Sequence, residues 1–348
     1  MSTHSSPEVA SRRLRLLLAG MAVVATLALG AGLTGVLIIK RYLDAPLALD
    51  EPVVVNIEPG RSLYQIASML ESRAALKWPR VFVQWVRWQE LDRAIRTGEY
   101  AVSSELTPRT LLALLMSGRN VQYPVTLVEG WTVRQALQAL WQLDTIVPTL
   151  QDLCDAEILA QLDSPFPALE GSLFPDTYFH TRGTTDVAIV RRALQRLDQV
   201  LEAEWQLRAD NLPYEDRWQA LVMASIIERE SGYRAEKADI AGVFVRRLQQ
   251  GMRLQSDPTV IYGMGEEYQG VIRRVDLNTT TPWNTYRING LPPTPIALSG
   301  RDSIHASLNP ADGSALYFVS RLDGTHYFSD TLEEHNAAVR RYLRGGDE

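Results

Sequence analysis

The stretch WQALVMASIIERESGYRAEK, residues 218–237, organises the C-terminal half of the chain. Up to Ile227 it is apolar on nearly every side of a helix, which is typical of a helix buried in a domain core. The apolar run then ends in two carboxylates, Glu228 and Glu230, and a serine and the stop signal Gly232 follow. The sequence therefore predicts a buried helix that carries acidic side chains at its C-terminal end.

These two carboxylates suit acid catalysis for two physical reasons. An acid near a helix C-terminus opposes the helix dipole, and burial disfavours its charged form. Both effects keep a carboxyl group protonated near neutral pH, as a general acid for a glycosidic oxygen requires. On a helix Glu228 and Glu230 point about 200° apart, so only one of them can face a given cleft. The alternative is a pair of surface glutamates at a frayed helix end, paired with Arg229 or Arg234.

Downstream blocks combine rigid backbone with short polar and aromatic side chains. RLQSDPTVIYG spans residues 253–263, and NTY and GLPPTPI follow at 284–286 and 290–296. Flat apolar faces beside polar groups suit the faces and hydroxyls of sugar rings. We therefore expect substrate contacts from Gln255, Ser256, Asp257, Asn284, Thr285 and Tyr286. The alternative is that the prolines only stiffen structural loops.

The N-terminal region holds one long apolar run, LLLAGMAVVATLALGAGLTGVLII, at residues 16–39. It is uncharged and long enough to cross a bilayer as a helix. A signal peptide has a shorter apolar core, so we expect an uncleaved anchor, although the alanines leave cleavage open. Arg12, Arg13 and Arg15 precede the run, and the positive-inside rule therefore places residues 1–15 in the cytoplasm and the rest of the chain outside.

A weak internal repeat follows a spacer at residues 40–52. IEPGRSLYQIASML (57–70) aligns with LVEGWTVRQALQAL (127–140), and each copy reads as strand, glycine turn, hydroxyl cap and amphipathic helix. The first copy resembles a LysM-type unit, a module associated with peptidoglycan glycan. The alternative is that any strand–turn–helix unit shows the same pattern.

Composition excludes several other classes of function. The net charge of −6 does not favour a nucleic-acid partner, because phosphate binding calls for a basic surface. The single cysteine, Cys154, excludes an intramolecular disulfide and a multi-cysteine zinc site. His326 and His335 lack a third ligand at a usual spacing. We therefore expect no metal and no cofactor.

Several separate blocks resemble the MltG/YceG-like endolytic murein transglycosylases. The resemblance covers about residues 170–345 and includes EGSLFPDTY (170–178), ASIIERESG (224–232), VFVRRLQQGMRLQSDPTVIYG (243–263), NTYRINGLPPTPI (284–296), and LYFV with HYFSDTLEEHN (316–319, 326–336). Taken together these blocks are far more specific than a single motif.

The resemblance implies cleavage of the MurNAc–GlcNAc β-1,4 bond of nascent glycan strands without water. One glutamate protonates the leaving oxygen and then takes the proton of the MurNAc 6-hydroxyl, which closes a 1,6-anhydro ring and terminates the strand. Wider lytic transglycosylases carry an apolar helix that ends in Glu-Ser, which favours Glu230 over Glu228. Two alternatives are a non-enzymatic peptidoglycan-binding scaffold and a muramidase-type hydrolase.

These observations predict an α+β protein of the bacterial inner membrane with its catalytic domain in the periplasm. The expected order is a cytoplasmic tail (1–15), a single transmembrane helix (16–39), a linker (40–52), a LysM-like domain (53–145) and a mixed catalytic domain with a helical core and a β-hairpin (146–348). The expected partners are peptidoglycan glycan strands, and cell-wall synthases in the same membrane are a further candidate.

Overall fold

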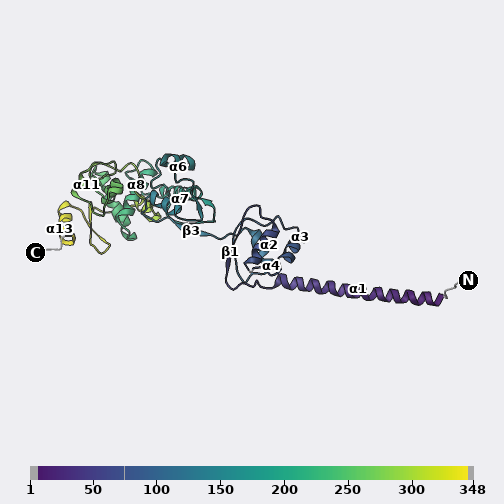
Figure 1. Cartoon of the computed structure of the whole chain (residues 1–348). Coiled ribbons are helices and arrows are strands. Elements are labelled where there is room, and N and C mark those ends of the chain that lie inside the picture. Colours follow the sequence, from purple (N-terminus) through teal and green to yellow (C-terminus); the bar gives the residue numbers. More distant parts are fainter. Residues whose placement is uncertain (1–6, 74, 344–348) are drawn as a thin grey trace. The chain divides into compact units, whose positions relative to one another are not determined.

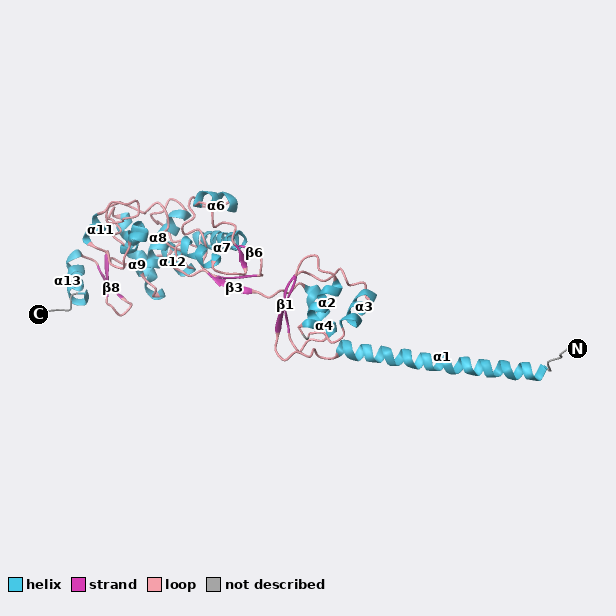
Figure 2. Cartoon of the chain, viewed as in Figure 1, coloured by secondary structure: helices cyan, strands magenta, loops and turns pink. Residues whose placement is uncertain are grey.

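The computed structural model describes residues 7–73 and 75–343, and the chain divides into two compact units, residues 1–121 and 122–348. Both units mix helices with short two-stranded sheets, as the sequence predicts (Figure 2). The division differs from the boundary expected between residues 145 and 146. Its cause is strand β3 (Tyr123–Thr126), which pairs antiparallel with the distant β5 (Thr177–His180) and so belongs to the second unit.

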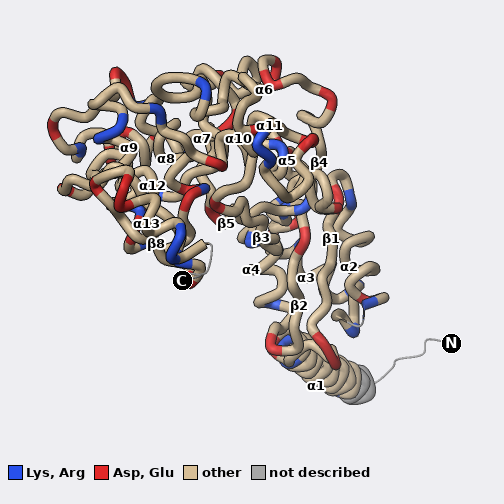
Figure 3. Tube along the Cα trace, turned by 90° about the vertical axis from the view of Figure 1, so that its left-hand side faces the viewer, with Lys and Arg blue, Asp and Glu red and all other residues tan. Residues whose placement is uncertain are grey.

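Helix α1 (Pro7–Asp44) contains the whole apolar run 16–39, and its segment Arg15–Asp44 is long and apolar enough to cross a membrane. The tube of α1 is tan over most of its length, which marks the absence of charge (Figure 3). The helix continues into the expected linker 40–52 and ends against the first unit, where Leu43 is buried. The first six residues of the expected cytoplasmic tail, residues 1–6, lie outside the described residues.

The first unit packs three helices on one side of a strand pair (Figure 2). Its elements are β1 (Val53–Ile57), α2 (Leu63–Ser72), α3 (Pro79–Trp88), β2 (Gly98–Val102) and α4 (Pro108–Ser117). Strands β1 and β2 are antiparallel, with Val53 opposite Val102 and Ile57 opposite Gly98. The apolar faces of the helices and strands close one core around Phe82, Tyr100 and Leu111. This unit therefore has its own core.

The internal repeat is visible as a repeated local structure. Gly60 and Gly130 both adopt a positive φ, of 81° and 78°, which glycine tolerates without strain. Each glycine is followed by a capping box, Ser62 with Gln65 before α2 and Thr132 with Gln135 before α5 (Val133–Trp141). The copies lie in different units, because α5 packs into the core of the second one.

The second unit is built around helix α8 (Arg217–Glu230), which contains most of the stretch 218–237. Every residue from Ala220 to Ile227 is buried, as the all-round apolar pattern predicts. One side of α8 packs in a core shared with α7, and the other packs in a core shared with α9. The remaining elements surround it (Figure 1): β4 (Ile146–Val147), α6 (Asp155–Leu162), β6 (Thr184–Thr185), α7 (Asp186–Gln206), α9 (Lys237–Gln249), α10 (Asp257–Met264), α11 (Arg274–Asn278), α12 (Arg301–Leu308) and α13 (Leu332–Leu343).

The predicted C-terminal hairpin is confirmed. Strands β7 (Tyr317–Ser320) and β8 (His326–Ser329) are antiparallel, and Gly324 supplies a positive φ of 89° in the turn. The hairpin packs on α9 through Phe318, whose ring meets Phe244 edge-on with 5.6 Å between the ring centroids.

Candidate active site

The two carboxylates at the end of α8 face different surroundings, as their spacing predicts. Glu228 is buried and forms an ion pair with the buried Lys237 over 2.9 Å. Its second oxygen accepts hydrogen bonds from the backbone N–H of Gly300 and the hydroxyl of Ser303, at 3.0 and 2.6 Å. Glu228 is therefore fully engaged in joining α8 to α9 and α12.

Glu230 instead lines an open cavity of about 300 Å³, which we call the Glu230 cavity. Its carboxylate Oε1 accepts a hydrogen bond of 2.5 Å from the hydroxyl of Ser256, and no other hydrogen bond to it is made within residues 7–73 and 75–343. The cavity is lined by Glu230, Arg247, Leu254, Gln255, Asp257, Tyr286, Tyr317, Phe318, Leu332 and His335. A ligand in this cavity would thus meet one side of the Glu230 carboxylate.

The surroundings of Glu230 raise its pKa to about 7. The main cause is desolvation by burial, and the negative charge of Asp257 adds to it. The hydrogen bond from Ser256 and the positive charge of Arg247 act in the opposite direction. A carboxyl group with a pKa near 7 is able to give up and take back a proton at neutral pH.

Three of the six expected substrate-binding residues reach the Glu230 cavity: Gln255, Asp257 and Tyr286. The Tyr286 hydroxyl donates a hydrogen bond of 2.6 Å to Asp257, so these two side chains form one polar wall. Gln255 has a φ of 53°, a left-handed conformation that is uncommon for a residue with a side chain. Such strain is often found at binding sites, where the surrounding structure holds a side chain in place.

The other three are buried beneath the cavity. Ser256 reaches Glu230, and its backbone N–H donates to the hydroxyl of Thr285 over 2.9 Å. The amide of Asn284 donates to the carbonyls of Asp276 and Thr279, at 3.1 and 2.6 Å. The short side chains of Asn284 and Thr285 bond to nearby backbone groups and support the wall, and substrate contact by these two residues stays a prediction.

The sequence did not single out the other polar residues of the cavity. Arg247 is buried, and its Nε and Nη1 donate to the carbonyls of Leu316 and Leu254, both at 2.6 Å. His335 lies on the ring of Tyr317, with 5.3 Å between the centroids, and desolvation lowers its pKa. Arginine in a helix read as amphipathic is usually assigned to the surface, so only the tertiary structure reveals Arg247.

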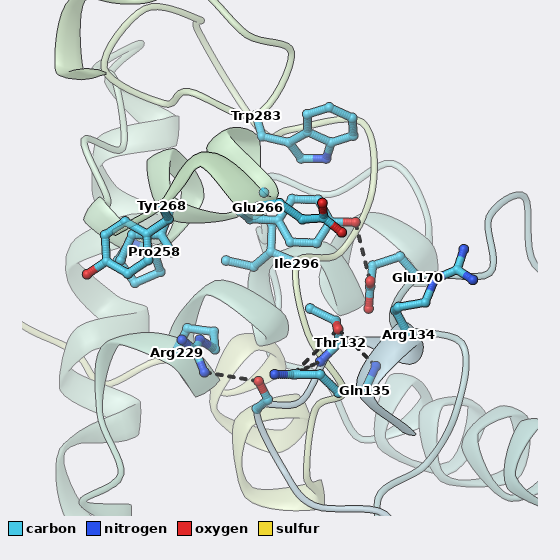
Figure 4. A pocket seen from close by; sticks show the side chains of 14 residues that line it. Thr132, Arg134, Gln135, Glu170, Arg229, Pro258, Glu266, Tyr268, Trp283 and Ile296 are labelled. Carbon is cyan, nitrogen blue, oxygen red and sulfur yellow. Dashed lines mark hydrogen bonds between the residues drawn. The ribbon is translucent and has the colours of Figure 1, made fainter. Parts of the chain in front are cut away.

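A second cavity of about 660 Å³ is bordered by Pro258 of α10, and we call it the Glu170 cavity (Figure 4). Its apolar wall contains Trp283 and Tyr262, whose rings meet edge-on at 5.4 Å. The start of α5 contributes Thr132, Arg134 and Gln135 to the lining. Arg229 and Ile296 also line the cavity. Aromatic walls next to carboxylate and amide groups again suit sugar rings.

Glu170 is a second acid with a pKa raised to about 7, mainly by desolvation. One carboxylate oxygen accepts from the backbone N–H groups of Val133 and Gly171, both at 3.0 Å. The other accepts from the Tyr262 hydroxyl at 3.3 Å, along a dashed line in Figure 4. The block EGSLFPDTY contains this residue, but nothing in the block itself marks its glutamate as buried.

The two histidines considered as metal ligands make different contacts. His326 contacts Glu236 through Nδ1 at 2.8 Å, whereas His335 lines the Glu230 cavity. Among the described residues no group of three or more histidine, cysteine, aspartate or glutamate side chains is arranged to hold a metal ion. Cys154 is exposed immediately before α6.

Comparison with known proteins agrees with this architecture. The endolytic murein transglycosylase of Bacillus subtilis (strain 168) is 29% identical over 90% of this chain and 92% of its own length. Its namesake from Streptococcus pneumoniae serotype 2 (strain D39 / NCTC 7466) is 27% identical over 87% of this chain, which spans 61% of that relative. The crystal structure of a yceG-like protein of Listeria monocytogenes superposes with a TM-score of 0.53 at 30% identity, covering 83% of this chain and 99% of that one.

The family comparison spans both units. The model of the YceG-like family matches residues 55–341, which include most of the strand pair of the first unit and the Glu230 and Glu170 cavities of the second. The chain therefore belongs to the YceG-like family.

Proposed function

We propose that this protein is an endolytic murein transglycosylase that cleaves the MurNAc–GlcNAc β-1,4 bond within peptidoglycan glycan strands. The observation that carries the proposal is Glu230, an acid with a pKa near 7 at the end of a buried helix and open to a cavity. Relatives that share 27–29% of its residues over most of the chain bear this activity in their names. Their names support the reaction class, and the cavity supports the choice of residue.

In the proposed mechanism Glu230 acts as both acid and base. Its proton passes to the GlcNAc O4 as the bond from MurNAc C1 to that oxygen breaks. The resulting carboxylate then takes the proton of the MurNAc 6-hydroxyl, and O6 bonds to C1 to give a 1,6-anhydro end. The glutamate is restored to its acid form, and no water is consumed.

The neighbours of Glu230 support both halves of this cycle. Desolvation and Asp257 favour the neutral acid before the bond breaks. Arg247 and the hydroxyl of Ser256 favour the carboxylate that exists between the two proton transfers. Because the resulting pKa is about 7, the protonated and ionised forms of Glu230 differ little in free energy at neutral pH.

Asp257 keeps one alternative open. It is a second carboxylate in the Glu230 cavity, and two carboxylates are the requirement of an ordinary glycoside hydrolase. In that reading, Asp257 would activate water or attack C1, and the product would have a reducing end. Its engagement by the Tyr286 hydroxyl at 2.6 Å favours a structural or binding role instead.

An endolytic enzyme binds sugars on both sides of the cleaved bond, and the Glu170 cavity is the proposed neighbouring site. Pro258 borders it and Asp257 borders the Glu230 cavity, so consecutive residues at the start of α10 line the two cavities. We infer that a sugar ring stacks near Trp283 there, with Glu170 accepting from or donating to a hydroxyl.

We further propose that α1 anchors the protein in the inner membrane once, with residues 1–15 in the cytoplasm and both units in the periplasm. The order β1–α2–α3–β2, with its antiparallel strand pair, supports a LysM-like glycan-binding role for the first unit. Cell-wall synthases that share the membrane are proposed partners, because they make the nascent strands.

The deciding experiment weighs the products released from purified glycan strands. Products with 1,6-anhydro ends are expected. Because no water is added, each should be lighter than the hydrolysed product by the mass of one water molecule, about 18 Da. Reducing ends would favour the hydrolase, and intact strands that remain bound would favour a non-enzymatic scaffold.

A further inference from the structure

The first unit carries an apolar groove of about 570 Å³ that is lined by residues of the C-terminal end of α1 and of α3. We call it the α1–α3 groove. It is lined by Val36, Ile39, Lys40, Leu43, Arg80, Val81, Gln84, Trp85, Trp88 and Arg109.

The groove exposes large aromatic side chains. Trp88 is 78% exposed, and Trp85 lines the groove beside it. Trp78, just before α3, is 39% exposed, and its ring contacts that of Tyr42 in a tilted arrangement with 5.0 Å between the ring centroids. Tryptophan has an apolar body and one N–H donor, which is why it gathers at the boundary between hydrocarbon and water.

The charges of the groove have one sign. Lys40, Arg80 and Arg109 line it, and no aspartate or glutamate does so among the described residues. Arg109 pairs with Asp44 over 2.9 Å, whereas Lys40 and Arg80 make no ion pair within residues 15–73 and 75–343. Two unpaired cations at the edge of an apolar surface suit the phosphate groups of lipids.

The end of α1 is fixed on the first unit, and this sets the level of the groove. Leu43 is buried, the Tyr42 hydroxyl donates to the carbonyl of Trp78 at 3.3 Å, and Asp44 holds Arg109. Val36 and Ile39 belong to the uncharged run and yet share the groove with Trp85 and Trp88 of α3. If this run crosses the bilayer, α3 must lie within about two helical turns of its end.

We propose that the α1–α3 groove is a phospholipid-binding surface that seats the first unit on the outer leaflet of the membrane. Lys40 and Arg80 contact lipid phosphates, and Trp85 and Trp88 enter the region between headgroups and acyl chains. The inference rests on the proposed membrane topology and is independent of the transglycosylase reaction. The anchor then holds the first unit against the bilayer instead of acting as a flexible tether.

The test uses the full-length chain in nanodiscs that hold one copy each and contain phosphatidylglycerol. Cys154, the only cysteine, is replaced by serine, and Trp88→Cys is labelled with an environment-sensitive fluorophore. The matched control is Tyr64→Cys on α2, a site that is 51% exposed and outside the groove. We expect a blue-shifted emission and strong quenching by headgroup-region spin-labelled lipid at position 88, and neither at position 64.

Further variants separate the possible outcomes. Replacing both Lys40 and Arg80 by glutamine should weaken quenching at position 88 and leave glycan cleavage in detergent unchanged. Equal signals at positions 88 and 64, or a protein that fails to enter nanodiscs, would overturn the proposal. A blue shift that appears only with two copies in each disc would also overturn it, because a second copy of the chain would then cover the groove. Loss of cleavage with normal quenching would contradict the proposed reaction and leave the phospholipid-binding proposal intact.

Discussion

The hydroxyl of Ser256 donates to Oε1 of Glu230 over 2.5 Å and couples the end of α8 to the start of α10. This contact is part of the balance that keeps the pKa of Glu230 near 7, since it favours the charged form while burial disfavours it. The proposed chemistry therefore depends on a residue that does not itself line the cavity.

Replacing Ser256 by alanine should raise the pKa of Glu230. A hydrogen bond is worth about 0.5–1.5 kcal/mol, so the fall of the rate at alkaline pH should move up by about one pH unit at most. The matched control is Ser303→Ala, which removes the hydroxyl bonded to Glu228. Rate–pH profiles of both variants check this, and an equal shift in the two would contradict the assignment of the profile to Glu230.

Glu230→Gln should remove most of the cleavage activity while keeping the fold, because glutamine fills the same volume without a transferable proton. Loss of a general acid costs typically about 10²- to 10⁴-fold in rate. Glu228→Gln should leave the proposed acid, Glu230, in place but destabilise the fold. It leaves the buried Lys237 without its charge partner, which costs about 3–5 kcal/mol of stability. Rates and melting temperatures of both variants are needed, and an active Glu230→Gln protein would refute the proposed role.

The same substitution should change how stability depends on pH. The folded-state pKa of Glu230, about 7, lies above its ordinary value of 4.5, so folding favours the protonated form. This contribution is complete below about pH 4.5 and is lost as the pH rises through 7. Glu230→Gln should therefore gain stability relative to the parent between pH 5 and 8, by about 1–3 kcal/mol. Denaturant melts at several pH values test this, and a constant difference would show that the pKa is not raised.

Much of this architecture follows from local sequence. The all-round apolar pattern before Ile227 specified a buried helix, hydroxyl caps marked the starts of α2 and α5, and Asp323-Gly324 marked the hairpin turn. The opposed directions of Glu228 and Glu230 followed from helical geometry alone. These features depend on residues only a few positions apart, which is why a single sequence reveals them.

The remaining features depend on contacts between distant residues. Strand β3 pairs with β5, and the paired residues Thr126 and Thr177 are far apart in the sequence. No local signal in the sequence places the boundary between the two units before β3. Arg247 and Glu170 become buried only when other segments close over them. Asn284 and Tyr286 are neighbours in sequence, yet one supports the loop and the other lines the cavity.

The Glu170 cavity can be tested separately from catalysis. Trp283→Ala and Glu170→Gln should raise KM for glycan strands more than they lower kcat, because the proposed site binds sugar away from the bond that breaks. Leu207→Ala serves as the control, since Leu207 is 70% exposed and lines neither cavity. A loss confined to kcat would instead make Glu170 a participant in the chemistry.

Asn284 and Tyr286 offer the sharpest separation of support from substrate contact. Tyr286→Phe keeps the ring and removes the hydroxyl that donates to Asp257. It should slow cleavage by about threefold to tenfold, the value of one hydrogen bond between this wall and a neutral sugar hydroxyl, with little change in melting temperature. Asn284→Ala removes the amide that donates to the carbonyls of Asp276 and Thr279 and should lower the melting temperature first. The cleavage rate of Asn284→Ala should fall only to the extent that the substitution displaces the loop that carries Tyr286.

The two variants must be compared as a pair, with rate and melting temperature measured for each. The expected pattern is a slow but stable Tyr286→Phe protein and a destabilised Asn284→Ala protein that regains activity at low temperature. That recovery follows because the side chain of Asn284 is buried and bonds to the backbone of residues 276–286, whereas Tyr286 lines the Glu230 cavity. If Tyr286→Phe cleaves at the parental rate, the Tyr286–Asp257 wall does not contact the glycan in the transition state. Persistent inactivity of a folded Asn284→Ala protein at low temperature would instead place Asn284 in direct contact with substrate.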